Sequence, residues 1–317
     1  MYCIIISSAY IHWLLRTQQS VLRAERTNAM DRRASMLATS FFLGGTIPHV
    51  CREMSRIEVS HYKIYTPALP SGFDGFRIVH LSDLHNKVFG KDNAPLFELA
   101  AAEKPHIIVM TGDMISHEAP DTDKFLQLVK RLAELCPVYY VNGNHELSDL
   151  DAEAFSYIAE TMASYGAVCL DNSSADIFRA DEKIHLCGLC YSSEYYRGVR
   201  EYKRGWKAFM LTDMINYLDV KQPDEYTILL AHNPLDFDVH AEWGADLSLG
   251  GHVHGGLIRL PFVQGIFSPE RKLMPKYKEG VYRIGNSFLI ASRGLGRFRV
   301  HNPPELVSVT LRKQQQK

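Results

Sequence analysis

Short apolar runs that end on turn residues recur along the chain from about residue 57 onward. Runs of four to six residues rich in Val, Ile, Leu and Tyr predict buried β-strands when turn residues bound them. Five such runs lead directly into polar residues or glycines: they span residues 76–81, 106–110, 138–141, 226–231 and 245–249. Because α/β sheets place their ligand sites at the carboxyl ends of strands, the pattern predicts an α/β fold with a polar site there.

Helices and further strands are predicted between and after these runs. Apolar residues at helical spacing predict helices over residues 93–103, 121–135, 151–165 and 204–218. Additional strands are predicted over residues 57–65 (as an edge strand), 167–170, 184–188, 281–283, 288–292 and 306–311. Strands alternate with helices through residue 145, which predicts a largely parallel first sheet, whereas the later strand-dense part predicts a second sheet with antiparallel pairs.

The five runs deliver side chains suited to divalent metal ions. The motifs at their ends are Asp83-Leu84-His85, Gly112-Asp113, Gly143-Asn144-His145-Glu146, His232 and Gly251-His252-Val253-His254-Gly255. Carboxylates, an amide and imidazoles without cysteine favour Mn, with Fe, Zn or Mg as alternatives, over a structural zinc site that recruits thiolates. Alone, His232 would more often be a satisfied buried histidine, and an Asp-x-His pair would more often belong to a turn. Together the five motifs predict a two-metal hydrolase.

Two metal ions explain why such a set would act on phosphate esters. Divalent cations roughly 3.5–4 Å apart clamp the attacking and leaving oxygens of an in-line displacement at phosphorus, and they acidify a bridging water toward hydroxide. Asp113 can bridge them, since the two oxygens of a carboxylate can bind separate ions. His145 can protonate the departing alkoxide or stabilise charge on the phosphoryl oxygens. Glu146 is interpreted either as an orienting residue behind the ligands or as a surface residue.

The ordered motifs resemble the pattern DxH, GD, GNH[D/E], H and GHxH of the calcineurin-like metallophosphoesterases, over residues 77–255. The glycine turn at residues 292–296 is similar to one in membrane-associated bacterial members of that family. The resemblance implies an α/β protein, a four-layer α/β/β/α sandwich of two mixed sheets with a dinuclear metal site at the strand ends. It also implies roles for individual residues. One metal would be held by Asp83, His85 and His254, the other by Asn144, His232 and His252, with Asp113 bridging and His145 facing the substrate phosphate.

Composition narrows the range of partners. The net charge of -1 and a pI near 6.9 provide no basic footprint, so nucleic acid is not an expected partner.

Cys187 and Cys190 form a C-x-x-C without a second pair, which predicts buried thiols, with a Cys169–Cys187 disulfide left open for an exported protein. Arg293 is interpreted either as a phosphate contact or as part of a structural turn. Residues 191–200 predict a solvated loop, with substrate contact as the alternative.

The N-terminal 55 residues differ from the rest of the chain. Two uncharged apolar runs, residues 1–15 and 34–51, flank a segment with five arginines and two acidic residues. Both runs are short for a membrane span, yet they predict a membrane anchor or export signal at residues 1–55 and a catalytic domain at residues 56–317. The positive-inside tendency would place that domain outside the cytoplasm, at the cell membrane. The alternative is a cytoplasmic enzyme with a core-packing extension.

The sequence therefore predicts a dinuclear-metal-dependent phosphoesterase, with phosphodiesters favoured as substrates. Attack by a metal-bridging hydroxide would cleave the ester bond. Two alternatives stay open: a hydrolase of lipid-linked diphosphates of the UDP-diacylglucosamine type, and a non-catalytic binding scaffold of the same fold. If the chain is anchored to a membrane, its phosphate-ester substrate would be lipid-linked or part of the cell envelope.

Overall fold

The computed structural model describes residues 55–116, 122–196, 207–256, 276–296 and 301–314. Residues 1–54 of the segment predicted as an anchor or export signal, residues 1–55, lie outside this range, so that interpretation and the domain boundary remain predictions. Within the described residues, no helix is both long and apolar enough to cross a membrane.

Two six-stranded mixed sheets form the centre of the molecule. The first sheet has the order β1-β12-β2-β3-β4-β5, and the second has the order β10-β11-β9-β8-β7-β6. The strands of the first sheet are β1 Glu58–Thr66, β12 Glu305–Lys313, β2 Arg77–Leu81, β3 Ile107–Thr111, β4 Val138–Val141 and β5 Ala167–Cys169. Those of the second are β10 Gly280–Ile284, β11 Ser287–Ala291, β9 Leu247–Gly250, β8 Thr227–Ala231, β7 Glu182–Leu189 and β6 Ser173–Arg179.

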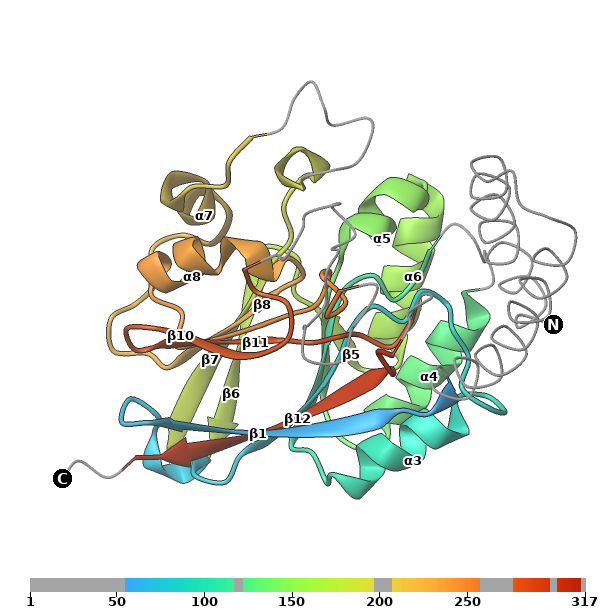
Figure 1. The fold of residues 1–317 in the computed structure, drawn as a ribbon, viewed down its shortest axis with the longest axis horizontal. Coiled ribbons are helices and arrows are strands. Elements are labelled where there is room, and N and C mark those ends of the chain that lie inside the picture. The colour runs from blue at the N-terminus through green and yellow to red at the C-terminus, as the bar shows by residue number, and fades with distance from the viewer. Residues whose placement is uncertain (1–54, 117–121, 197–206, 257–275, 297–300, 315–317) are drawn as a thin grey trace, which may run out of the picture.

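Helices cover the outer face of each sheet (Figure 1). The α-helices are α3 Ala94–Ala102, α4 Asp123–Ala133, α5 Asn144–Asp149, α6 Ala152–Ser164, α7 Leu211–Leu218 and α8 Phe237–Trp243. Short 3-10 helices occur at Ser71–Phe73, Ser193–Tyr195 and Pro234–Asp236. Helices α3, α4 and α6 pack on the first sheet, whereas α7 and α8 pack on the second. The predicted α/β/β/α sandwich is therefore confirmed.

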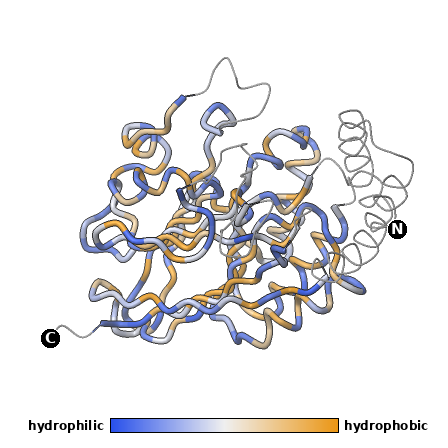
Figure 2. Tube along the Cα trace, viewed as in Figure 1, coloured by the Kyte–Doolittle hydropathy of each residue, from blue (hydrophilic) through white to orange (hydrophobic). Residues whose placement is uncertain are grey.

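Alternation along the strands explains the layering. In β2 and β3, Ile78 and Val109 face the second sheet, whereas Val79 and Ile108 face the helices. The apolar cluster between the sheets draws on both of them, including Ile228 of β8, so the sheets pack face to face. Strands buried on both faces read as continuous apolar runs, which is why β2, β3, β4, β8 and β9 were predictable. Figure 2 shows hydrophobic stretches of the trace running through the centre of the molecule.

Strand direction follows the prediction for the first sheet and only partly for the second. In the first sheet, β2 to β5 run parallel and only the β12–β2 pair is antiparallel. In the second, antiparallel pairs are confined to β6–β7 and β10–β11, and β7, β8, β9 and β11 are paired in parallel. Strands β2 and β3 of the first sheet and β8 and β9 of the second send their carboxyl ends toward the same region, because side chains that follow these strands have polar atoms within 4.8 Å of one another.

Four helices or strands differ from the sequence-based expectations. Strand β6 was not predicted, and neither were the short helices α5 and α8. The helix predicted over residues 204–218 begins only at Leu211, and residues 204–206 of that prediction lie outside the described part. Residues 208–210 have no regular structure, so the predicted helix was too long at its start.

Candidate metal centre

All seven predicted metal ligands follow the carboxyl ends of strands. Asp83, Asp113 and Asn144 come after β2, β3 and β4 of the first sheet, while His232 and the His252–His254 turn follow β8 and β9 of the second. Three groups of side chains have ligand atoms within 4.8 Å of one another: Asp83, His85 and His254; His85, Asp113 and His145; and Asp113, His232 and His252. The structure thus brings together six of the seven predicted ligands, all but Asn144, and places His145 with them.

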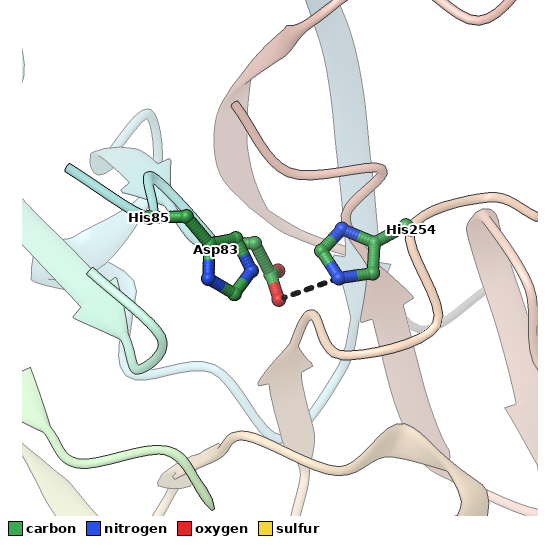
Figure 3. A group of neighbouring side chains, drawn as sticks. All are labelled: Asp83, His85 and His254. Carbon is green, nitrogen blue, oxygen red and sulfur yellow. Dashed lines mark ion pairs between the residues drawn. The ribbon is translucent and has the colours of Figure 1, made fainter. Parts of the chain in front are cut away.

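The first group consists of Asp83, His85 and His254 (Figure 3). The Nε2 atom of His254 is 3.6 Å from Oδ1 of Asp83, and both side chains are at most 2% exposed. The rings of His85 and His254 are 5.3 Å apart between centroids. One carboxylate and two imidazoles converge here from two different sheets.

Asp113 lies between this group and the second one. Its Oδ2 atom is 3.2 Å from Nε2 of His232 and 3.9 Å from Nε2 of His85. His232 and His252 contact each other edge to face, with ring centroids 5.0 Å apart. A carboxylate that faces imidazoles of both groups has the placement of a bridging ligand.

The backbone at these ligands adopts an unfavourable conformation. Five of the seven have φ near +50° to +60°: Asp83, His85, Asp113, His252 and His254. The left-handed region costs a non-glycine residue ~1–2 kcal/mol, and such strain gathers at functional sites because the surroundings enforce it. At Gly251, an added Cβ would collide with Ser82 Oγ and with the Asp83 carboxylate. These turns therefore direct the side chains toward one point, and the strained backbone lowers local stability.

Hydrogen bonds behind the ligands fix which atom each one presents. The Nδ1 atom of His232 donates to the Thr111 carbonyl over 2.6 Å, so Nε2 faces the site. The backbone N–H of His252 donates to Asp83, at 3.1 Å from both carboxylate oxygens. The side chain of Asn302, 2% exposed, donates to the carbonyls of His254 (2.6 Å) and Gly256 (2.9 Å). These bonds hold the two histidine-bearing loops against the first sheet.

Glu146 is buried and supports two loops of the site, so it is an orienting residue behind the predicted ligands and not a surface residue. It is 1% exposed, and its carboxylate accepts three backbone N–H groups: those of Asp113 (2.8 Å), Gly143 (2.8 Å) and Ile115 (3.0 Å). Burial and the charge of Asp113 raise the pKa of the Glu146 carboxyl. The side chain therefore ties the Gly112-Asp113 loop to the Gly143-Asn144 loop, and the surface interpretation was wrong.

The donor set fits divalent cations. Oδ1 of Asn144 is buried and accepts no hydrogen bond within the described part of the chain, although buried amide oxygens are normally satisfied. Burial alone would raise the pKa of Asp113, but His232, His145 and His85 hold it well below its usual range. Burial alone would lower the pKa of His232, but Asp113 raises it to about 9. A histidine so placed carries a proton that a cation would replace, as expected of a metal ligand.

His145 stands at the edge of the cluster. Its Nε2 atom is 4.0 Å from Oδ2 of Asp113, and its side chain is 23% exposed, unlike the buried ligands around it. Its backbone N–H donates to Oδ1 of Asp113 over 2.8 Å. Its Nδ1 atom contacts Oδ2 of Asp149 at 2.6 Å. Asp149 was missed from the sequence, because its relation to His145 depends on the unpredicted helix α5.

Arg293 is held by carboxylates. Its guanidinium lies 3.0 Å from Glu58 and 3.2 Å from Glu305, and its backbone N–H donates to Glu305 over 2.7 Å. In the same turn, the N–H groups of Leu295 and Gly296 donate to the carbonyls of Ser82 and Asp83. The structure favours the interpretation of this segment as a structural turn that supports the Asp83 loop.

The structure also tests the predictions for the cysteines and for residues 191–200. Cys136, Cys169, Cys187 and Cys190 are free thiols, so the Cys169–Cys187 disulfide is not formed. Residues 197–200 of the predicted solvated loop lie outside the described part, but Tyr191 and Tyr196 are each only 2% exposed. The Tyr196 ring is 5.2 Å from that of His252, so the first half of this segment is an aromatic wall beside the site and not a solvated loop.

Comparison with known proteins identifies the family. A family model described as calcineurin-like phosphoesterase matches residues 76–256, more than half of the chain. The chain belongs to this family. A calcineurin-like phosphoesterase is a metal-dependent hydrolase of phosphate esters, which agrees with the clustered ligands and with the sandwich fold.

Curated relatives support this assignment. The chain is 29% identical over 271 residues to the uncharacterized metallophosphoesterase YkuE of Bacillus subtilis, covering 82% of this chain and 87% of the relative. It is 26% identical over 300 residues to the phosphodiesterase YaeI of Escherichia coli, covering 90% and 98%. It is 23% identical over 249 residues to a transmembrane protein with a metallophosphoesterase domain from Danio rerio, covering 74% and 55%.

Proposed function

We propose that this phosphoesterase uses two divalent metal ions, with Mn favoured, and that it prefers phosphodiesters. The observation that carries the proposal is the position of Asp113, whose Oδ2 atom lies 3.9 Å from Nε2 of His85 in one group and 3.2 Å from Nε2 of His232 in the other. One ion would be held by Asp83, His85 and His254, and the other by Asn144, His232 and His252. When bound, such a pair supplies an acidified water and neutralises charge on the phosphoryl group.

The chain's own residues would complete the site. The Nε2 atom of His145 faces the same carboxylate oxygen as His232 but from the more exposed side. From that side it can hydrogen-bond a phosphoryl oxygen or protonate the leaving oxygen as the ester bond breaks. The aromatic wall formed by Tyr191 and Tyr196 limits water on the side of His252.

The preference for diesters rests on charge. Arg293, the arginine that sequence analysis singled out, is held by Glu58 and Glu305, so its positive charge is already compensated by two carboxylates. A diester carries one negative charge, whereas a monoester at neutral pH is largely a dianion that benefits from additional cationic groups. The relative named as a phosphodiesterase, YaeI, agrees with this proposal.

The test is turnover of bis(4-nitrophenyl) phosphate against 4-nitrophenyl phosphate with saturating Mn²⁺. We expect kcat/KM for the diester to exceed that for the monoester by at least about tenfold, which corresponds to roughly 1.4 kcal/mol of transition-state stabilisation. A protein that binds metal but hydrolyses neither ester would support the non-catalytic scaffold. Faster cleavage of a lipid-linked diphosphate than of either ester would favour the lipid-linked alternative.

We also propose a membrane location. Residues 1–55 contain the two apolar runs and the arginine-rich segment between them, and some metallophosphoesterase relatives are named as transmembrane proteins. The positive-inside tendency favours a catalytic domain outside the cytoplasm. Fractionation of the full chain tests this: recovery in the membrane fraction supports the anchor, and full recovery in the cytosol contradicts it.

A further inference from the structure

Asp149, which contacts the Nδ1 atom of His145, lies outside the five metal motifs. Asp149 ends helix α5, four residues after His145, and residues at this spacing are neighbours on a helix surface. Its Oδ2 atom accepts a hydrogen bond from Nδ1 of His145 over 2.6 Å, because an ionised carboxylate can only accept. Its other oxygen, Oδ1, accepts from the Ser148 hydroxyl over 2.8 Å.

This contact fixes the orientation of the His145 ring. The ring packs edge to face against His85, with centroids 4.9 Å apart and an interplanar angle of 90°. The backbone of His145 is tied to Asp113, and its Nε2 atom points toward the same residue. With the Nδ1 hydrogen committed to Asp149, any proton that the ring exchanges with substrate must move through Nε2.

The position of Asp149 is unfavourable for the helix itself. Negative charge at the carboxyl end of a helix opposes the helix dipole, typically by ~0.3–1 kcal/mol. The last turn of α5 carries no basic residue. The hydrogen bond from His145 offsets this cost to α5.

We propose that Asp149 is a positioning residue for ester hydrolysis, holding Nδ1 of His145 so that Nε2 is presented to the leaving oxygen. This inference rests on the proposed function. In the step it supports, the oxygen of an attacking hydroxide bonds to phosphorus, while the P–O bond to the leaving group breaks and its electron pair goes to the leaving oxygen. The N–H bond at Nε2 then breaks, and its proton forms the new O–H bond. Asp149 exchanges no proton and contacts no reacting atom.

A double-mutant cycle tests the proposal in the full chain. We expect Asp149→Ala to lower kcat by about 10- to 100-fold, within the range for general-acid catalysis, while metal content and KM stay unchanged. Asp149→Asn can still accept the Nδ1 hydrogen through its amide oxygen, so it should retain more activity than Asp149→Ala. In a His145→Ala background, Asp149→Ala should cause no further loss, because the ring it positions is absent.

The leaving group supplies a second readout. Phenolate leaves less readily than nitrophenolate and needs more protonation, so the loss in Asp149→Ala should be larger for diphenyl phosphate than for bis(4-nitrophenyl) phosphate. Asp151→Asn is the matched control: this carboxylate is two residues away and caps α6 by accepting the Ala154 N–H, a bond that asparagine can also accept. The control should retain full kcat on both esters.

Several results would overturn the proposal. Asp149 and Asp151 both line a cleft of about 230 Å³ with Ile115, Leu150 and Tyr157. A role in holding substrate there would raise KM and leave kcat unchanged, and losses that add in the double variant would show that Asp149 acts independently of His145. Full kcat in Asp149→Ala, with an active wild type, refutes the role of Asp149 alone. A wild type that binds two metals and hydrolyses neither ester refutes the proposed function itself.

Discussion

Replacing Glu146 by glutamine should weaken the support of the proposed metal centre without replacing any of the predicted metal ligands. Glu146→Gln keeps the size of the side chain but exchanges one accepting oxygen for an N–H₂ group. Among the backbone N–H groups, those of Asp113 and Gly143 donate to Oε2, and that of Ile115 donates to Oε1. The glutamine oxygen should therefore take the place of Oε2, which leaves its N–H₂ group facing the N–H of Ile115.

The magnitude follows from these contacts. One charge-assisted hydrogen bond contributes ~1.5–3 kcal/mol, and a buried N–H without an acceptor costs ~1–3 kcal/mol. Part of this is returned, because burial and Asp113 raise the pKa of Glu146 and so penalise its charge. We expect a net loss of about 2–4 kcal/mol in the free energy of unfolding. For a domain of this size the melting temperature should fall by about 5–10 °C.

Chemical denaturation in the presence of chelator measures this loss separately from metal binding. A metal titration of the same variant should show weaker affinity, since Glu146 ties the loop of Asp113 to the loop of Asn144. Glu160→Gln on the exposed face of α6 is the matched control and should stay within about 0.5 kcal/mol of the wild type. Wild-type stability and metal affinity in Glu146→Gln would refute the bracing role.

Two further outcomes follow from buried groups. His240 is fully buried, its ring nitrogens have no hydrogen-bond partner in the described residues, and burial lowers its pKa to about 3. Its pKa in the unfolded chain is about 6.5, so the free energy of unfolding decreases as pH falls from 6.5 toward 3, by ~1.4 kcal/mol per pH unit. His240→Leu should lessen this pH dependence in denaturation curves. An unchanged dependence of the free energy of unfolding on pH would contradict this prediction. Gly251→Ala should lower metal content and kcat together, because its Cβ would collide with the Asp83 carboxylate. Gly166→Ala is the control: its added Cβ would meet open space at a φ of +83°, so it should lower stability but leave metal content and kcat unchanged. Full metal content in Gly251→Ala would refute the steric argument.

The elements that carry the site were predictable because they are buried on both faces. Strands β2, β4 and β8 are continuous apolar runs, and their predicted bounds agree with the structure to within one residue. Strand β6 was missed because it lies at a sheet edge and carries mostly exposed polar residues. Helices α5 and α8, of six and seven residues, are too short for a helical period to stand out.

The supporting residues were less predictable than the ligands. The ligand types, their order and their place at strand ends are properties of the sequence. The role of Asp149 depends on the geometry of α5, and Asn302 reaches the His254 loop from 48 residues away. Arg293 could be assigned to a structural turn only when Glu58, 235 residues earlier, was found beside it. Such long-range partners leave no local pattern.

The most direct test of a dinuclear site is a metal titration of the chelated full chain, with bound ions and hydrolysis of bis(4-nitrophenyl) phosphate followed together. We expect binding to saturate at two divalent ions per chain, activity to return in parallel, and Asp113→Ala to lose both. Asp113 faces ligands of both groups, so no other single substitution should affect both ions as strongly. Full activity after exhaustive chelation, or saturation of activity at one ion, would contradict the two-metal centre.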